Sequence, residues 1–131
     1  MNRILHKVVI GAIASAVAGG IAGAQTVAEI TVQAKRVPTV TVLGRTTSGA
    51  SIREISLISG VSTAGLDLSS SAGADALAKR VHDAAAAACR EIGQKYPNST
   101  PSDRECARVA AEEAMVRVHE VIAAAQKHAA K

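Results

Sequence analysis

The feature that most restricts how this chain can fold is its pair of cysteines, Cys89 and Cys106. They flank a polar stretch interrupted by Pro97, and each lies in an alanine-rich segment whose apolar residues recur at helical spacing. Proline ends a helix because the residue before it avoids helical backbone angles. If the chain reverses about Pro97 and Asn98, the two cysteines come opposite each other at nearly the same height. We therefore predict an antiparallel helical hairpin that a disulfide can close.

Residues 1–24 are a predicted secretory signal peptide. Arg3 and Lys7 precede an apolar run over residues 8–22, and residues 22–24 are the small residues that signal peptidase favours. A membrane anchor needs about 20 strongly apolar residues, whereas this run is shorter and diluted by glycine and serine. We expect cleavage after this segment and delivery of the remaining chain to the bacterial periplasm, with no membrane span left.

The cysteine pair allows three interpretations. An exported chain meets an oxidising compartment, where two cysteines normally form a structural disulfide, and this is the favoured interpretation. A catalytic redox pair usually has CxxC spacing at a helix start, whereas Cys89 lies late in its predicted helix and far from Cys106. A metal site would need further ligands, and of the nearby histidines His82 lies one heptad before Cys89 while His119 falls on the charged side.

The segment before the hairpin predicts two or three short strands. The stretch EITVQAKR, residues 29–36, alternates β-branched or small apolar residues with polar ones, which is strand patterning. Further runs cover residues 39–43 and 52–63. In the last of these, Ile58 is out of phase with its apolar neighbours and Gly60 indicates a bulge.

Capping residues set the limits of the two predicted helices. Ser69 and Ser70 offer an N-cap for the first helix, and Gly93 and Pro97 are expected to end it. Ser102, followed by a glutamate three residues later, forms a capping box for the second helix. Alanine fills the apolar stripes of both helices, so they can pack closely.

The predicted fold class is therefore α+β. A β-rich segment over residues 25–64 precedes the disulfide-linked helical hairpin of residues 65–131, and together they form one small domain.

Composition argues against several classes of function. Tyr96 is the only aromatic residue, so platforms for stacking bases, sugars or flavins are missing, and loss of the signal peptide lowers a formal charge of only +4. No nucleophile elbow, phosphate loop or zinc motif occurs, and the remaining histidines are scattered. Glu112 and Glu113 are consecutive on a helix and cannot converge on one substrate. We expect no enzyme activity, no cofactor, no metal and no nucleic-acid partner.

The stretch from Val61 to Cys89 resembles the UrcA family of small exported bacterial proteins. The matching positions are Val61, Ser62, Leu66, Asp67, Leu68, Ser69, Gly73, Leu77, Arg80, Val81 and Cys89. Thr63 and Gly65 depart from the family pattern, where tyrosine and aspartate are common. The resemblance implies secretion and a cysteine pair, without an established activity. On its own, Asp67 is typical of a helix-entry acid, and Gly73 indicates a crowded first turn.

Two surfaces are candidates for binding another protein. EITVQAKR is similar to a short stretch near the mature N-terminus of many TonB-dependent receptors, which pairs edge-on with a periplasmic partner, although a strand of the fold is the favoured interpretation. Val109 and Val116 interrupt the charged side of the second helix one heptad apart. We expect a non-enzymatic interaction or envelope-stress module, and the alternative is a thiol-based redox or metal-responsive periplasmic protein that uses the cysteine pair.

Overall fold

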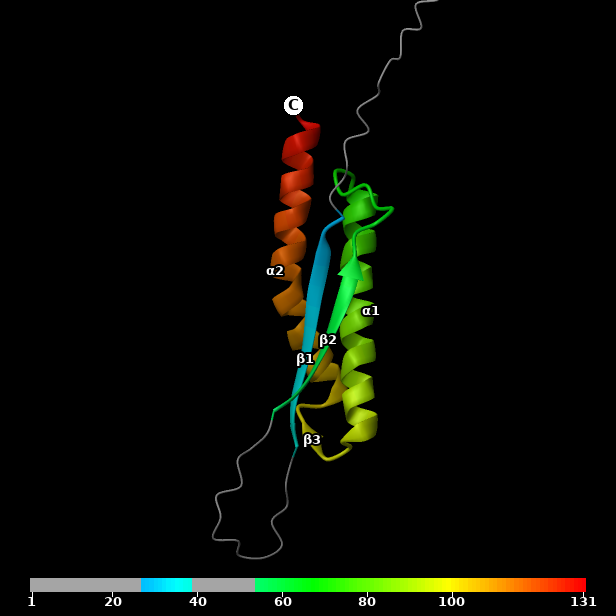
Figure 1. The fold of residues 1–131 in the computed structure, drawn as a ribbon, viewed down its shortest axis with the longest axis vertical. Coiled ribbons are helices and arrows are strands. Elements are labelled where there is room, and N and C mark those ends of the chain that lie inside the picture. Colours follow the sequence, from blue (N-terminus) through cyan, green and yellow to red (C-terminus); the bar gives the residue numbers. More distant parts are fainter. Residues whose placement is uncertain (1–26, 39–53) are drawn as a thin grey trace, which may run out of the picture.

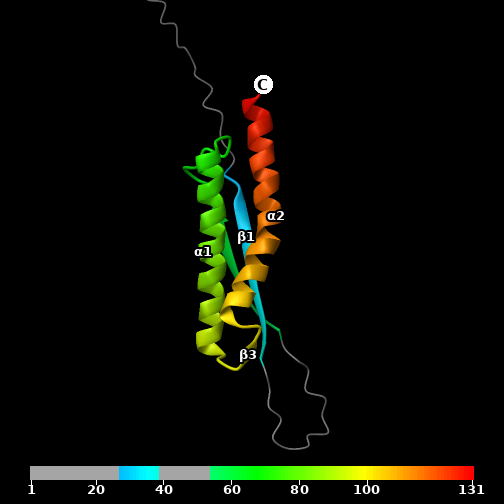
Figure 2. The same cartoon turned by 180° about the vertical axis from the view of Figure 1, so that it is seen from behind.

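The structure is a computed structural model that describes residues 27–38 and 54–131, and it confirms the predicted α+β fold. Its elements follow along the chain as β1 (Glu29–Pro38), β2 (Ile55–Ser62), α1 (Ser71–Lys95), β3 (Ser99–Thr100) and α2 (Asp103–Ala129). The strands form one antiparallel sheet in the order β2-β1-β3. Both helices run along one face of this sheet, so the molecule has two layers (Figures 1 and 2).

The strand pattern read from the sequence places the core. In β1, Ile30, Val32 and Ala34 are fully buried beneath the helices, while the alternate residues point to the open face. Residues 29–36 pair without interruption with residues 62–55 of β2. The bulge expected at Gly60 is therefore wrong, because Gly60 stands directly opposite Thr31 in the regular register. The strand expected over residues 39–43 lies outside the described residues.

The helices begin where the sequence predicts and the first one ends later. The Ser70 hydroxyl accepts a hydrogen bond from the Gly73 amide at 3.1 Å and caps α1. Gly93 does not end this helix, which continues to Lys95 because the first residue with non-helical angles is Tyr96, directly before Pro97. The bend that follows contains β3, a strand that the sequence did not predict.

Alanine allows the two helices to approach closely. Side chains of both helices and both long strands form the larger part of the core, around Ile30, Val32, Val61, Leu77, Val81, Ala85, Ala110, Ala111, Ala114 and Val118. A second cluster lies near the bend and consists of Ala34, Ala88, Cys89, Ile92 and Cys106. The apolar stripes predicted for the two helices are thus the surfaces that meet each other and the sheet.

Candidate functional site

The cysteines form the predicted disulfide at the closed end of the hairpin. Cys89 lies late in α1 and Cys106 lies in the first turn of α2, with 5.9 Å between their Cα atoms. Both residues are buried, at 0% and 2% exposure. The bond therefore joins the end of one helix to the start of the other from inside the core.

A buried arginine sits beside this disulfide. Arg36, the last residue of EITVQAKR, is only 4% exposed although it carries a positive charge. Its guanidinium donates to the Ser99 carbonyl at 2.7 Å and, more weakly, to the Cys89 carbonyl at 3.4 Å, and it forms an ion pair with Asp103. One side chain of β1 thus contacts the end of α1, the bend and the first residue of α2.

The surroundings of Arg36 are shaped to accept it. Ser99 pairs with Pro38 in the sheet, and its buried carbonyl accepts its hydrogen bond from the Arg36 guanidinium. Gly93 leaves the space for the ion pair, because a methyl group there would overlap the Asp103 carboxylate and the Arg36 guanidinium. The Arg36 Nε has no hydrogen-bond partner among the described residues.

Sequence reasoning missed this cluster, although a signal for it was present. Arg36 has the same parity along the strand as Ile30, Val32 and Ala34, which predicts that it points inward with them. The structure also bears on the docking hypothesis for EITVQAKR. This stretch pairs along its whole length with β2, while β3 pairs only with Val37 and Pro38 beyond it, and half of its side chains are buried, so its release to a partner would expose the core.

The residues that resemble the UrcA pattern build the turn before α1. The Asp67 carboxylate accepts hydrogen bonds from the Ser69 hydroxyl and amide, while its carbonyl accepts from the Ser70 hydroxyl and amide. The hydrogen bonds from Ser69 hold the pKa of Asp67 below its ordinary value. Gly73 is buried against the Asp67 backbone, and a methyl group there would overlap the Asp67 carbonyl oxygen. The acid therefore organises the helix entry.

The other residues of this pattern connect the turn to the sheet and the core. Arg80 donates to the carbonyl oxygens of Ser62 at 3.0 Å and Ala64 at 3.3 Å, which ties α1 to the end of β2. Leu77 is fully buried, and Leu66 and Leu68 pack against the same core as partly buried residues. Each of these side chains has a structural contact of its own.

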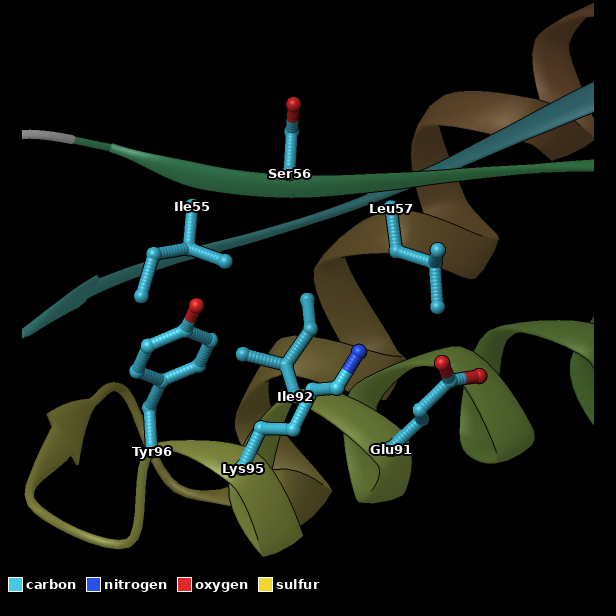
Figure 3. A pocket seen from close by; sticks show the side chains of 7 residues that line it. All are labelled: Ile55, Ser56, Leu57, Glu91, Ile92, Lys95 and Tyr96. Carbon is cyan, nitrogen blue, oxygen red and sulfur yellow. The ribbon is translucent and has the colours of Figure 1, made fainter.

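A shallow pocket lies between β2 and the end of α1. It has a volume of about 180 Å³ and is lined by Ile55, Ser56, Leu57, Glu91, Ile92, Lys95 and Tyr96. Ile55 and Leu57 point from the strand toward the helix, the Tyr96 ring lies below Ile55, and Ser56 points away (Figure 3). The pocket is mostly apolar, and Glu91 and Lys95 are the only charged residues in its lining.

A wider groove lies at the opposite, open end of the hairpin. The turn before α1 and the last turns of α2 form its walls, which include Asp67, Ser69, Arg117 and His128. Its volume is about 1070 Å³ and it opens widely to solvent. Its lining also includes the buried Thr63, whose hydroxyl donates to the Ala28 carbonyl at 2.9 Å.

Titratable groups elsewhere on the described surface do not converge. His82, His119 and His128 are exposed, as are Glu112 and Glu113. The Glu105 carboxylate was expected to reach back to Ser102 as half of a capping box, but it accepts hydrogen bonds from Arg108 along the helix instead. These hydrogen bonds lower the pKa of Glu105. Within residues 27–38 and 54–131, no group of three or more His, Cys, Asp or Glu side chains is arranged to hold a metal ion.

The outer face of α2 carries the two predicted apolar exceptions. Val116 is 63% exposed and Val109 is 38% exposed. Ion pairs surround them, from Arg108 to Glu105 and Glu112, and from Arg117 to Glu120. The two valines are therefore the apolar points of an otherwise charged surface, which we call the α2 outer face.

Comparisons with known proteins do not assign this chain to a family. No protein-family model, no curated protein and no solved structure matches it. Among the helices of the described residues, none has the length and apolarity needed to cross a membrane.

Proposed function

We propose that this chain is a non-enzymatic protein-interaction module of the bacterial cell envelope, exported by its N-terminal signal and related to the UrcA family. Exposure of Val109 and Val116 within the charged α2 outer face is the observation that carries the proposal. An exposed apolar pair with a charged rim suits a partner surface of the same design, with an apolar centre and complementary charges around it.

The rest of the described molecule favours binding over chemistry. The two hollows hold few ionisable groups, and the buried Arg36 is engaged by Ser99 and Asp103. The disulfide and the Arg36 contacts hold α2 in a fixed position on the sheet, which suits a rigid surface presented to a partner.

The alternative is a thiol-based redox or metal-responsive protein. It would need access to Cys89 and Cys106, which are buried in the second core cluster. Alkylation of the freshly released periplasmic protein distinguishes the two functions. We expect labelling only after a reductant and a denaturant have been added, whereas rapid labelling under native conditions would support the redox function.

The interaction proposal is tested with a photo-crosslinking residue at position 116 in living cells. We expect a discrete crosslinked product that is lost when Val109 is changed to Lys, because the added charge would lie in the apolar centre of the contact. The matched control carries the crosslinker at Ala87, which is exposed on α1. Equal products at both positions, or none at position 116, would contradict the proposal.

Export is tested separately by the intact mass of the protein recovered from the periplasm. The expected mass is that of a chain beginning at Gln25. A chain that keeps residues 1–24, or one that stays in the cytoplasm, would show that the envelope location is wrong.

A further inference from the structure

The packing at the closed end of the hairpin does little to fix how far along each other the two helices lie. The bend that joins them covers residues 96–102, from the end of α1 at Lys95 to the start of α2 at Asp103. Alanine is the commonest residue around the disulfide, and alanine surfaces meet without large side chains that interlock. A disulfide nevertheless needs its two Cα atoms about 4.4–6.8 Å apart. A directional contact with both helices would bring Cys89 and Cys106 into this range before the bond forms.

Arg36 makes such a contact with both helices. Its guanidinium donates weakly to the carbonyl oxygen of Cys89 itself, at 3.4 Å, and forms an ion pair with Asp103 in the first turn of α2. Asp103 lies three residues before Cys106, whose amide donates to the Ser102 carbonyl at 2.9 Å. The guanidinium therefore holds the backbone of one cysteine and the helical turn that carries the other.

The same side chain also holds the bend. Arg36 donates to the Ser99 carbonyl at 2.7 Å, so α1, the bend and α2 each supply one acceptor. A guanidinium is planar and presents its N–H groups in fixed directions, so the positions of the three acceptors depend on one another. Arg36 is 4% exposed, and hydrogen bonds shielded from water are stronger than those at the surface.

The strand β1 fixes where the guanidinium lies. Arg36 pairs with Ile55 of β2, and the next residue, Val37, pairs with Thr100 of β3. The end of β1 runs beside the bend and the first turn of α2 (Figure 2). Two positions before Arg36 on the same face of the strand, Ala34 packs in the cluster that contains both cysteines. The sheet is therefore a support from which Arg36 can position the two helices.

We propose that Arg36 is the positioning residue of the disulfide and brings Cys89 and Cys106 together in the folded, reduced chain. The bond needs an oxidant, for which a small disulfide such as glutathione disulfide is sufficient. One S–S bond forms in the protein and the S–S bond of glutathione breaks, so two electrons and two protons pass from the protein to two glutathione thiols. Arg36 takes no part in this transfer. It raises the effective concentration of each cysteine thiol at the other.

Equilibration of the purified protein with glutathione measures this effective concentration. It is the square of the glutathione thiol concentration divided by the glutathione disulfide concentration when half of the protein is oxidised, reached from both sides. We expect Arg36→Met to lower it at least about tenfold, because the buried charge no longer bonds to either helix. Arg36→Lys keeps the charge without the planar fork, so we expect a fall of about three- to tenfold.

Two control variants separate positioning from overall stability. Lys35→Met removes the exposed neighbouring cation and should change the effective concentration less than about twofold. Gly73→Ala acts at the open end of the hairpin, where its methyl group would overlap the Asp67 carbonyl and lower the stability of the fold. It should also change the effective concentration less than about twofold, because distant sites contribute independently.

An unchanged effective concentration in Arg36→Met would overturn the proposal. An equal fall in Gly73→Ala would also overturn it, because cysteine pairing would then follow overall stability. In urea that unfolds the chain, the wild type and Arg36→Met should have equal values, and a persisting difference would contradict a role of the folded contacts. If reduced Arg36→Met does not fold, the same comparisons with Arg36→Lys decide. The test does not involve the α2 outer face, so its result is independent of the proposed partner binding.

Discussion

Reduction of the Cys89–Cys106 disulfide should lower the free energy of unfolding by about 3 kcal/mol. The two residues are separated by 17 positions, and closing a loop of that length removes about 3 kcal/mol of chain entropy from the unfolded state. For a domain of this size a change of 1 kcal/mol shifts the Tm by roughly 4–8 °C, so the reduced protein should melt at least about 12 °C lower. Reduction removes no side-chain carbon or sulfur, so little of the expected loss comes from a new cavity.

The assay is urea unfolding of the same preparation with and without a reductant. We expect the midpoint to move to lower urea in the reduced sample. The control is the double variant Cys89→Ala and Cys106→Ala, which should be insensitive to the reductant and no more stable than the reduced protein, because it also loses two buried sulfur atoms.

Equal midpoints for the oxidised and reduced protein would refute the reasoning. They would mean that the unfolded chain already keeps the two helices together, so that the disulfide removes no entropy from it. A loss much larger than about 5 kcal/mol would also contradict it, because that exceeds what loop closure supplies.

Three further substitutions test the contacts of β1 and of the helix entry. Arg36→Met should destabilise the fold by about 2–3 kcal/mol in urea unfolding, because the buried Ser99 carbonyl loses its hydrogen-bond donor. The control is Lys35→Met at the exposed neighbouring residue, which should change stability by less than about 0.5 kcal/mol. Gly73→Ala should cost about 1–3 kcal/mol despite its higher helix propensity, because the methyl group overlaps the Asp67 carbonyl, and a stabilised variant would contradict this. Folding lowers the pKa of Asp67, so the stability that its carboxylate adds to the fold is present above its ordinary pKa near 3.8 and is lost as the pH falls through the folded value. Asp67→Asn should therefore flatten the loss of stability in acid. An unchanged pH profile of stability would show that the hydrogen bonds of Asp67 contribute nothing.

The buried arginine changes what the N-terminal strand means for function. The sequence EITVQAKR is compatible with a segment that docks to a partner and with a strand of the fold, because apolar and polar residues alternate in both. In the fold, Arg36 contacts the ends of both helices and Ala34 packs in the cluster that contains the disulfide. Removal of this strand would therefore expose the core and leave the bend without its donor. We expect deletion of residues 25–36 to unfold the domain.

The sequence by itself determined the local features of this protein. Alternation over residues 29–36 gave a strand, helical spacing with Ser70 and Ser102 as caps gave two helices, and the position of the cysteines around Pro97 gave a disulfide-closed hairpin. These succeed because periodicity, capping and proline sterics act over a few residues and need no knowledge of distant partners.

Only the tertiary structure decided which residues meet across long separations. The two-residue strand β3 exists because Val37 and Pro38 happen to lie beside the bend, and Arg36 is buried because carbonyl groups from the bend and from α1 converge on it. The absence of a bulge at Gly60 likewise depends on β1, because Gly60 pairs with Thr31 in an uninterrupted register. Strand order and the burial of a charge are set by how separate segments pack, and a local pattern carries no record of its distant neighbours.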